Sequence, residues 1–153
     1  MVSRASKTTW VLRRMRVLGV DTKTLVQYWK AEGRVHLEMA CPVWHSGLTV
    51  AQVRSLEQAQ RLAMVAMAGW NPSHSQQLTD LGLERLSVRR ERMCLRLARK
   101  TATVSRHTDM FTPTINPRAR TSKEYWEPLC RTTTYYKSPL PYLTRLLNSN
   151  SNM

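Results

Sequence analysis

The stretch from Asp21 to His45 constrains the fold most strongly, because it has the pattern of a helix that other helices surround. Five polar side chains recur in it at spacings of three, four, four and seven residues: Gln27, Lys30, Arg34, Glu38 and His45. At about 100° per residue, these spacings keep the polar residues on one narrow ridge of a helix. The remaining positions are mostly apolar, so we expect a central helix that is buried on most sides.

The two ends of this helix carry opposite signals. Asp21 is expected to be its N-cap, since a carboxylate accepts hydrogen bonds from the free amides of a first turn. Pro42 removes a backbone donor and crowds the carbonyl four residues earlier. The sequence therefore predicts that the helix kinks near Glu38 or stops by Cys41.

Further helices are expected on both sides of this segment. Residues Thr8–Leu18 have Val11, Met15 and Leu18 on one side, and Gly19 follows as a helix stop. Thr49 and Gln52 have the spacing of a capping box and open a third helix that Gly69 ends. The expected inner face of that helix is small and apolar: Val53, Leu56, Ala59, Gln60, Ala63, Ala66 and Met67.

The second half of the chain is expected to be less regular. A short helix is predicted near Ser75–Leu81, and Ser87 is expected to cap a long helix from Val88 to about Val104. The sequence from 105 to 138 is rich in proline, threonine and arginine and has no helical or strand period. We predict an all-α protein: a flexible N-terminus at 1–7, a bundle of four or five helices at 8–104, an extended or disordered basic tail at 105–138, and a short C-terminal helix with a frayed end from Asn148, at 139–153.

The charge favours a polyanionic partner. The formal net charge is +14, spread over both ends and the middle of the chain. Within the helix predicted from Val88, five cations fall within about 100° around the axis: Arg89, Arg92, Arg96, Arg99 and Lys100. We predict that this side contacts the backbone of RNA, DNA or a hybrid duplex, which carries little sequence information.

No enzyme site is evident. His36, Cys41 and His45 have metal-ligand side chains, but a nine-residue separation turns the two histidines away from each other on a helix. Glu32 and His36 are expected to form a polar pair inside the bundle. The acidic residues are isolated from one another in the sequence, so we predict no catalytic residue, metal or cofactor. The three cysteines are widely separated, which favours a reducing compartment over a disulfide framework.

Membrane insertion is not expected, because the longest uncharged apolar stretch, Leu62–Trp70, is under half of the roughly 20 residues that a span needs. We expect a nuclear or cytoplasmic protein. The first 20 residues are basic and acid-free, so mitochondrial import is an alternative.

Several blocks of the sequence resemble the C-terminal region of reverse transcriptases of animal non-LTR retrotransposons. They are TTWVLRRMRVLGVD near the start, EGRVHLEMACPVWHSGLT at 32–49, LEQAQRLAMVAMAGW at 56–70 and TTTYYKSPLPYLTRLL at 132–147. In that family this region forms the helical thumb and a C-terminal extension, which hold template and growing strand. The fingers, palm and metal-binding aspartates are missing here, so the resemblance implies a non-catalytic fragment that binds nucleic acid. The alternative is a non-functional relic or a self-associating helical module with no nucleic-acid role.

Overall fold

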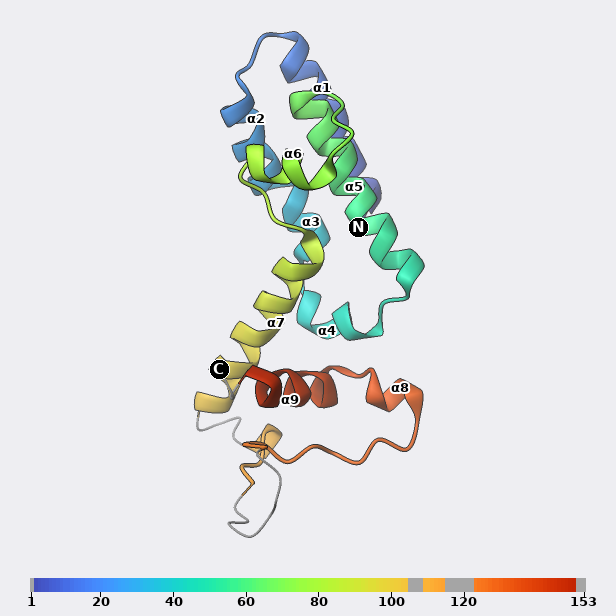
Figure 1. Cartoon of the computed structure of the whole chain (residues 1–153), viewed down its shortest axis with the longest axis vertical. Coiled ribbons are helices and arrows are strands. Elements are labelled where there is room, and N and C mark those ends of the chain that lie inside the picture. The colour runs from blue at the N-terminus through green and yellow to red at the C-terminus, as the bar shows by residue number, and fades with distance from the viewer. Residues whose placement is uncertain (1, 105–108, 115–122, 151–153) are drawn as a thin grey trace. The chain divides into compact units, whose positions relative to one another are not determined.

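The described residues of the computed structural model, 2–104, 109–114 and 123–150, form helices and no β-strand (Figure 1). One isolated bridge joins Pro113 to Tyr125. The prediction of an all-α protein is therefore confirmed. The chain divides into two compact units, which differ from the single predicted bundle at 8–104: unit 1 comprises residues 1–39 and 49–89, and unit 2 comprises residues 40–48 and 90–153.

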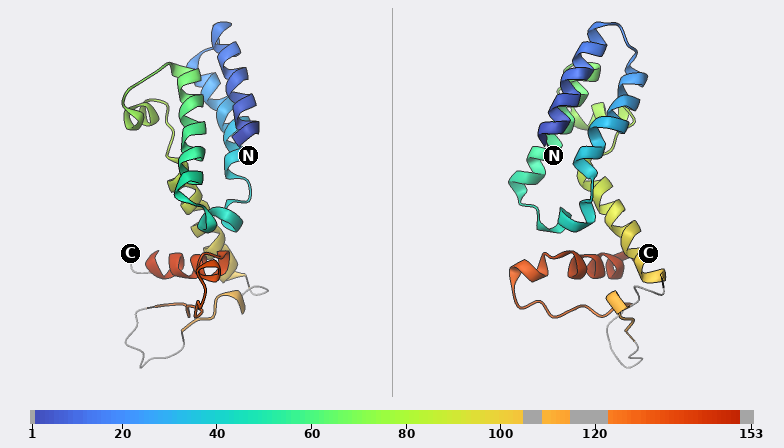
Figure 2. Two further views of the ribbon diagram at one scale, coloured as in Figure 1. Left: turned by 90° about the vertical axis from the view of Figure 1, so that its right-hand side faces the viewer. Right: turned by 180° about the vertical axis from the view of Figure 1, so that it is seen from behind.

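Unit 1 is built around the paired helices α1 (Val2–Val17) and α5 (Val50–Ala68), which lie side by side (Figure 2). The shorter helices α2 (Thr22–Tyr28), α3 (Arg34–Glu38) and α6 (His74–Asp80) pack with them, and the first turn of α7 (Leu86–Thr103) also belongs to this unit. Its buried apolar side chains come from every one of these elements; they include Leu12, Leu25, Trp29, Leu37, Ala63, Met64, Leu78 and Leu86.

The stretch from Asp21 to His45 is segmented rather than continuous. Helix α2 begins as predicted, because Asp21 accepts hydrogen bonds from the backbone N–H and the hydroxyl of Thr24 at 3.0 and 2.6 Å. A single π-helical turn, η1 (Trp29–Gly33), then leads into α3, which ends at Glu38 within the predicted limit. Ala40 is left-handed, with φ of 53°, before the short α4 (Cys41–Trp44) and the 3₁₀ turn η2 (His45–Gly47).

The expectation of a helix buried on most sides is wrong for the second half of this stretch. The side chains of Val35, Met39 and Val43 are 48%, 54% and 67% exposed. The π turn accommodates an extra residue, so the residues after it face other directions than in a continuous α-helix. Glu38, placed on the polar ridge by the sequence pattern, is consequently buried.

The π turn depends on close packing between two of its own residues. Trp29 is fully buried, and a Cβ added to Gly33 would lie 2.0 Å from Cε3 of its indole. No side chain fits at that distance, so the position requires glycine.

Helix α5 agrees closely with its prediction. The hydroxyl of Thr49 accepts from the Gln52 amide at 3.2 Å, and the Gln52 side chain accepts from the Thr49 amide at 2.8 Å, which completes the capping box. The helix ends at Gly69, whose φ is 90°. The predicted inner face is buried except Val53, which is half-buried.

Helix α1 differs from its prediction in both start and face. It begins at Val2, so residues expected to be flexible are helical. Its buried side chains are Ala5, Thr8, Thr9 and Leu12, whereas Leu18, expected inside, is 81% exposed. Its predicted stop is confirmed, since Gly19 has a φ of 83°.

Unit 2 contains α4, η2, the rest of α7, α8 (Thr133–Tyr136) and α9 (Pro139–Asn150). Its core is formed by α7, α9 and one residue of the predicted tail: Cys94, Ala98, Phe111, Leu143, Leu146 and Leu147. Helix α9 reaches Asn150, beyond the predicted start of fraying.

The predicted tail is partly ordered. Asn148 accepts from the Tyr125 amide at 2.9 Å and donates to the Tyr125 carbonyl at 3.0 Å, which holds residues 123–127 on α9. Helix α8 also lies in this part of the chain, where no helical period was predicted. Residues 105–108 and 115–122 of the predicted tail, and 151–153 of the predicted frayed end, lie outside the described residues.

Candidate nucleic-acid interface

Helix α7, which carries the predicted basic side, is started by a carboxylate from another helix. Glu57 of α5 accepts from the backbone amides of Leu86 and Ser87 at 3.3 and 2.8 Å. Ser87, the predicted N-cap, therefore lies inside the first turn. A negative charge at this position satisfies free amides and favours the positive end of the helix dipole. No local pattern in the sequence pairs Glu57 with residues 29 and 30 positions later.

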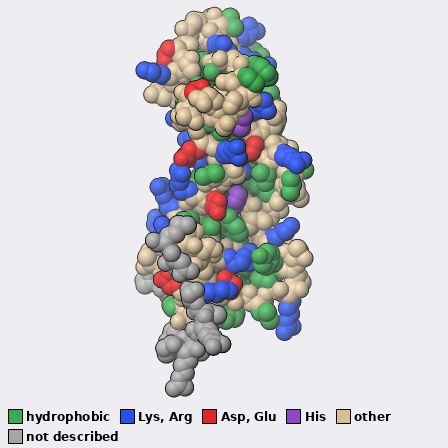
Figure 3. All heavy atoms as spheres, in the orientation of Figure 1, with side chains coloured by type: hydrophobic (Ala, Val, Ile, Leu, Met, Phe, Trp, Pro, Cys, Tyr) green, Lys and Arg blue, Asp and Glu red, His purple; other side chains and the backbone are tan. Residues whose placement is uncertain are grey.

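The remainder of α7 has two clearly different sides. Cys94 and Ala98 are fully buried in unit 2. On the opposite side, four of the five predicted cations are exposed, and we call them the basic ridge: Arg92, Arg96, Arg99 and Lys100. Figure 3 shows one face of the molecule, on which Lys and Arg side chains are more widespread than Asp and Glu.

Arg89, the fifth predicted contact, is instead part of an ion-pair network inside unit 1. Its Nε donates to Oε1 of Glu38 at 2.6 Å and its Nη2 donates to Oε2 at 3.2 Å, a two-pronged contact. This hydrogen bond raises the pKa of Arg89 above its ordinary value. Arg89 also lies 3.9 Å from Glu84. Arg89 is therefore half-buried and held by a carboxylate, whereas the other four predicted cations are exposed, and we leave it out of the basic ridge.

Glu38 is shared between two guanidinium groups. Nε of Arg34 lies 3.6 Å from the carboxylate, and Arg34 is only partly exposed. Burial and the nearby charge of Arg89 both lower the pKa of Arg34. The buried carboxylate thus holds two cations together that would otherwise repel each other, and loss of one partner from such a network is costly.

Arg90, the next residue of α7, is also structural. It is fully buried in unit 2, and its guanidinium lies 5.9 Å from the centre of the Trp44 ring, within cation–π range. Burial, with a smaller contribution from Arg90, lowers the pKa of the neighbouring His45. A run of arginines in the sequence does not reveal which of the arginine side chains are buried.

The expected polar and metal-ligand residues do not form a reactive site. Glu32 is exposed, so the predicted inward-facing pair with His36 is wrong. Cys41 contacts the Arg90 carbonyl at 3.9 Å, and within the described ranges no group of three His, Cys, Asp or Glu residues could hold a metal. A hydrogen bond with Cys41, together with burial, raises the pKa of Cys94, so this thiol stays protonated and is a poor nucleophile.

The most densely charged exposed group on α7 is therefore the basic ridge. None of the helices described there is both long and apolar enough to cross a lipid bilayer. Comparisons with models of protein families, with curated proteins and with solved structures found no match to this chain.

Proposed function

We propose that this protein is a non-catalytic helical module that binds nucleic-acid backbone, without sequence preference, through the basic ridge. The observation that carries the proposal is the exposure of Arg92, Arg96, Arg99 and Lys100 opposite the buried side of α7. Cations one turn apart repel each other by about 0.2–0.5 kcal/mol per pair. Phosphate groups relieve that repulsion, and the release of their counterions drives binding.

The resemblance to the C-terminal region of non-LTR retrotransposon reverse transcriptases supports the same proposal. In that family the thumb holds the template and growing strand without contributing catalytic aspartates. We infer a thumb-like remnant whose activity, on its own, is limited to holding nucleic acid. The all-α architecture is compatible with this origin.

The test is the salt dependence of binding, measured by fluorescence anisotropy with labelled duplex DNA, duplex RNA, hybrid and single strands. When the logarithm of the affinity for duplex DNA is plotted against the logarithm of the salt concentration, each neutralised phosphate contributes about −0.9 to the slope. Four contacts therefore predict a slope near −3.6. A slope near zero would refute the proposal.

A pair of matched variants separates the ridge from the bulk charge. Arg96→Gln with Arg99→Gln should make the slope less steep by about 1.8 on duplex DNA and by about 1.4 on single strands. The control, Arg131→Gln with Lys137→Gln, removes the same charge from exposed positions in unit 2 outside α7. Equal losses in the two double variants would show that net charge alone, rather than the ridge, drives binding. Circular dichroism should show unchanged helicity in both.

The alternative function is self-association without a nucleic-acid role. Exposed apolar side chains of unit 1 favour it, since Val17, Leu18 and Trp70 are 82%, 81% and 72% exposed. Light scattering during size-exclusion chromatography distinguishes the two functions. Assembly that grows with concentration, in a protein with no affinity for any strand, would support self-association.

A further inference from the structure

Helix α1 presents a second basic surface, distinct from the ridge of α7. Its cations are Arg4, Lys7, Arg13, Arg14 and Arg16, and the helix contains no Asp or Glu. Its buried side is formed by small and apolar residues such as Ala5 and Leu12, so these long side chains project elsewhere.

An aromatic ring lies among these cations. Trp10 is 60% exposed, and the guanidinium of Arg14, one turn later, lies 5.3 Å from the centre of its ring. Lys7 precedes Trp10 by three residues and is exposed on the same side of the helix. An exposed indole beside cations is the combination on which proteins stack unpaired bases while they neutralise phosphates.

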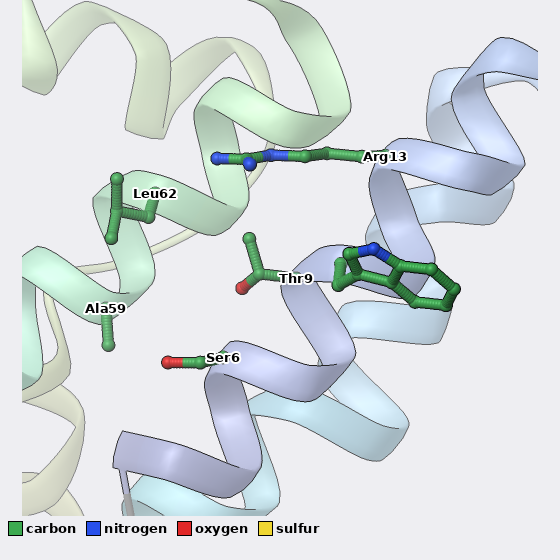
Figure 4. A pocket seen from close by; sticks show the side chains of 6 residues that line it. Ser6, Thr9, Arg13, Ala59 and Leu62 are labelled. Atoms are coloured by element: carbon green, nitrogen blue, oxygen red, sulfur yellow. The ribbon is translucent and has the colours of Figure 1, made fainter.

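A hollow of about 170 Å³ opens beside Trp10, between α1 and α5. Figure 4 shows Arg13 reaching from α1 toward α5, with the side chains of Ser6 and Thr9 below it on α1; Ala59 and Leu62 line the hollow from α5. The space is below the roughly 300 Å³ of a site for a drug-sized ligand, so a small polar group suits it better.

The same arginine connects this hollow to a second one. Arg13 and Arg16 both line a neighbouring hollow between the two helices, and Nη1 of Arg16 donates to the Val65 carbonyl at 3.4 Å. A row of guanidinium groups thus follows the seam between α1 and α5. The one acidic residue of α5, Glu57, is engaged elsewhere, because its carboxylate accepts from the backbone amides at the start of α7.

We propose that Trp10 and the adjoining part of this seam form a site for single-stranded nucleic acid, in which one base stacks on Trp10 and the flanking phosphates pair with Arg13 from the seam and with Arg14 beside the ring. The site goes beyond the backbone binding proposed for α7, because it requires an accessible base face. A duplex keeps its bases stacked on each other, so this site prefers unpaired strands. The positive charge of α1 complements this polyanionic partner.

The test uses the full chain, a labelled 12-nucleotide oligothymidylate and a 12-base-pair DNA duplex. Trp10→Ala should weaken oligothymidylate binding by about 5- to 160-fold, the range for loss of one stacked base, while duplex binding changes less than twofold. Trp10→Phe keeps an aromatic ring and should recover most of the affinity. Trp70→Ala is the matched control, because it removes another exposed indole from unit 1.

The phosphate contacts have their own readout. Arg13→Gln and Arg14→Gln should each reduce the salt slope on oligothymidylate by about 0.7. The Arg96→Gln with Arg99→Gln variant should retain the preference for single strands conferred by Trp10. A result that refutes binding at the ridge can therefore be told apart from a result that refutes binding at the seam.

Three results would overturn the proposal. The first is an equal effect of Trp10→Ala on single strands and duplex, and the second is an equal effect of Trp10→Ala and Trp70→Ala. The third uses vesicles of phosphatidylcholine and phosphatidylserine, since a basic helix with exposed aromatic residues also suits an anionic lipid surface. Loss of vesicle binding in Trp10→Ala, with oligothymidylate binding unchanged, would assign α1 to lipid instead.

Discussion

Replacing Gly33 with alanine should destabilise unit 1, because the new methyl group would overlap the indole of Trp29. The added Cβ would lie 2.0 Å from Cε3 and 2.2 Å from Cζ3 of that ring. Carbon atoms in contact are normally about 3.5–4.0 Å apart, so either the backbone or the ring has to move by more than 1 Å. Trp29 is fully buried, and the close packing typical of protein interiors leaves its ring little room to move.

The size of the effect follows from two opposing contributions. Alanine is about 1 kcal/mol better than glycine inside a helix. Overpacking of a core costs about 1–3 kcal/mol, and expulsion of a buried tryptophan costs about 3–5 kcal/mol. The net loss in the free energy of unfolding of unit 1 is about 0–2 kcal/mol if the core absorbs the overlap and about 2–4 kcal/mol if the ring is expelled. Because the overlap is as close as 2.0 Å, we expect the second outcome.

Urea unfolding followed by circular dichroism measures this loss, and Gly47→Ala is the control. A Cβ at Gly47 meets no atom within 4 Å, so that substitution should change stability by less than about 1 kcal/mol. In a Trp29→Leu background, Gly33→Ala should cost much less, because the overlapping ring is gone. If Gly33→Ala proves as stable as Gly47→Ala, then the π turn does not pack as described.

Three further predictions concern single contacts. Glu57→Ala should cost about 1–2 kcal/mol and speed amide exchange in the first turn of α7, because two backbone donors lose their carboxylate. Asn148→Leu should cost about 2–4 kcal/mol and expose the Tyr125 amide to exchange, because both of its reciprocal hydrogen bonds with Tyr125 are lost. The pKa of His45 is lowered in the folded protein, so as the pH falls the unfolded chain takes up a proton at this residue before the folded protein does. The contribution of neutral His45 to stability is therefore full above pH about 6.5 and declines as the pH falls below that value. Thermal unfolding of wild type and His45→Gln between pH 8 and 5 should show a smaller decline in the variant.

Those features of the fold that depend on neighbouring residues could be predicted from the sequence. Asp21 caps α2, and Thr49 with Gln52 caps α5, because each contact joins residues three positions apart. The buried side of α5 followed from helical periodicity alone. Such features need no knowledge of where the chain goes next.

Contacts between distant residues could not be predicted in this way. The sequence of a π turn looks like that of an ordinary helix. The turn nevertheless changes the directions in which the side chains of the following helix, α3, project, and Glu38 is buried there. The order in the predicted tail likewise depends on Asn148, which lies 23 residues after its partner Tyr125. Neither proline content nor the lack of a helical period indicates such a pair.

The candidate site shows the same division within one helix. Periodicity correctly grouped Arg92, Arg96, Arg99 and Lys100 on the exposed side of α7, because the buried side is marked by Cys94 and Ala98. It also included Arg89, whose partner Glu38 comes from a helix 51 residues earlier. A helical pattern gives the side on which a cation lies but not the carboxylate that it meets.

This difference decides how loss of binding in an arginine variant has to be interpreted. Removing Arg89 leaves the buried Glu38 with only its longer contact to Arg34, so the variant loses stability and, through unfolding, also loses binding. Removing Arg96 takes away an exposed charge and should leave stability within about 0.5 kcal/mol. Binding alone therefore cannot separate the two roles. The salt slope can, since it counts phosphates neutralised by the molecules that remain folded, and only cations that contact nucleic acid change it.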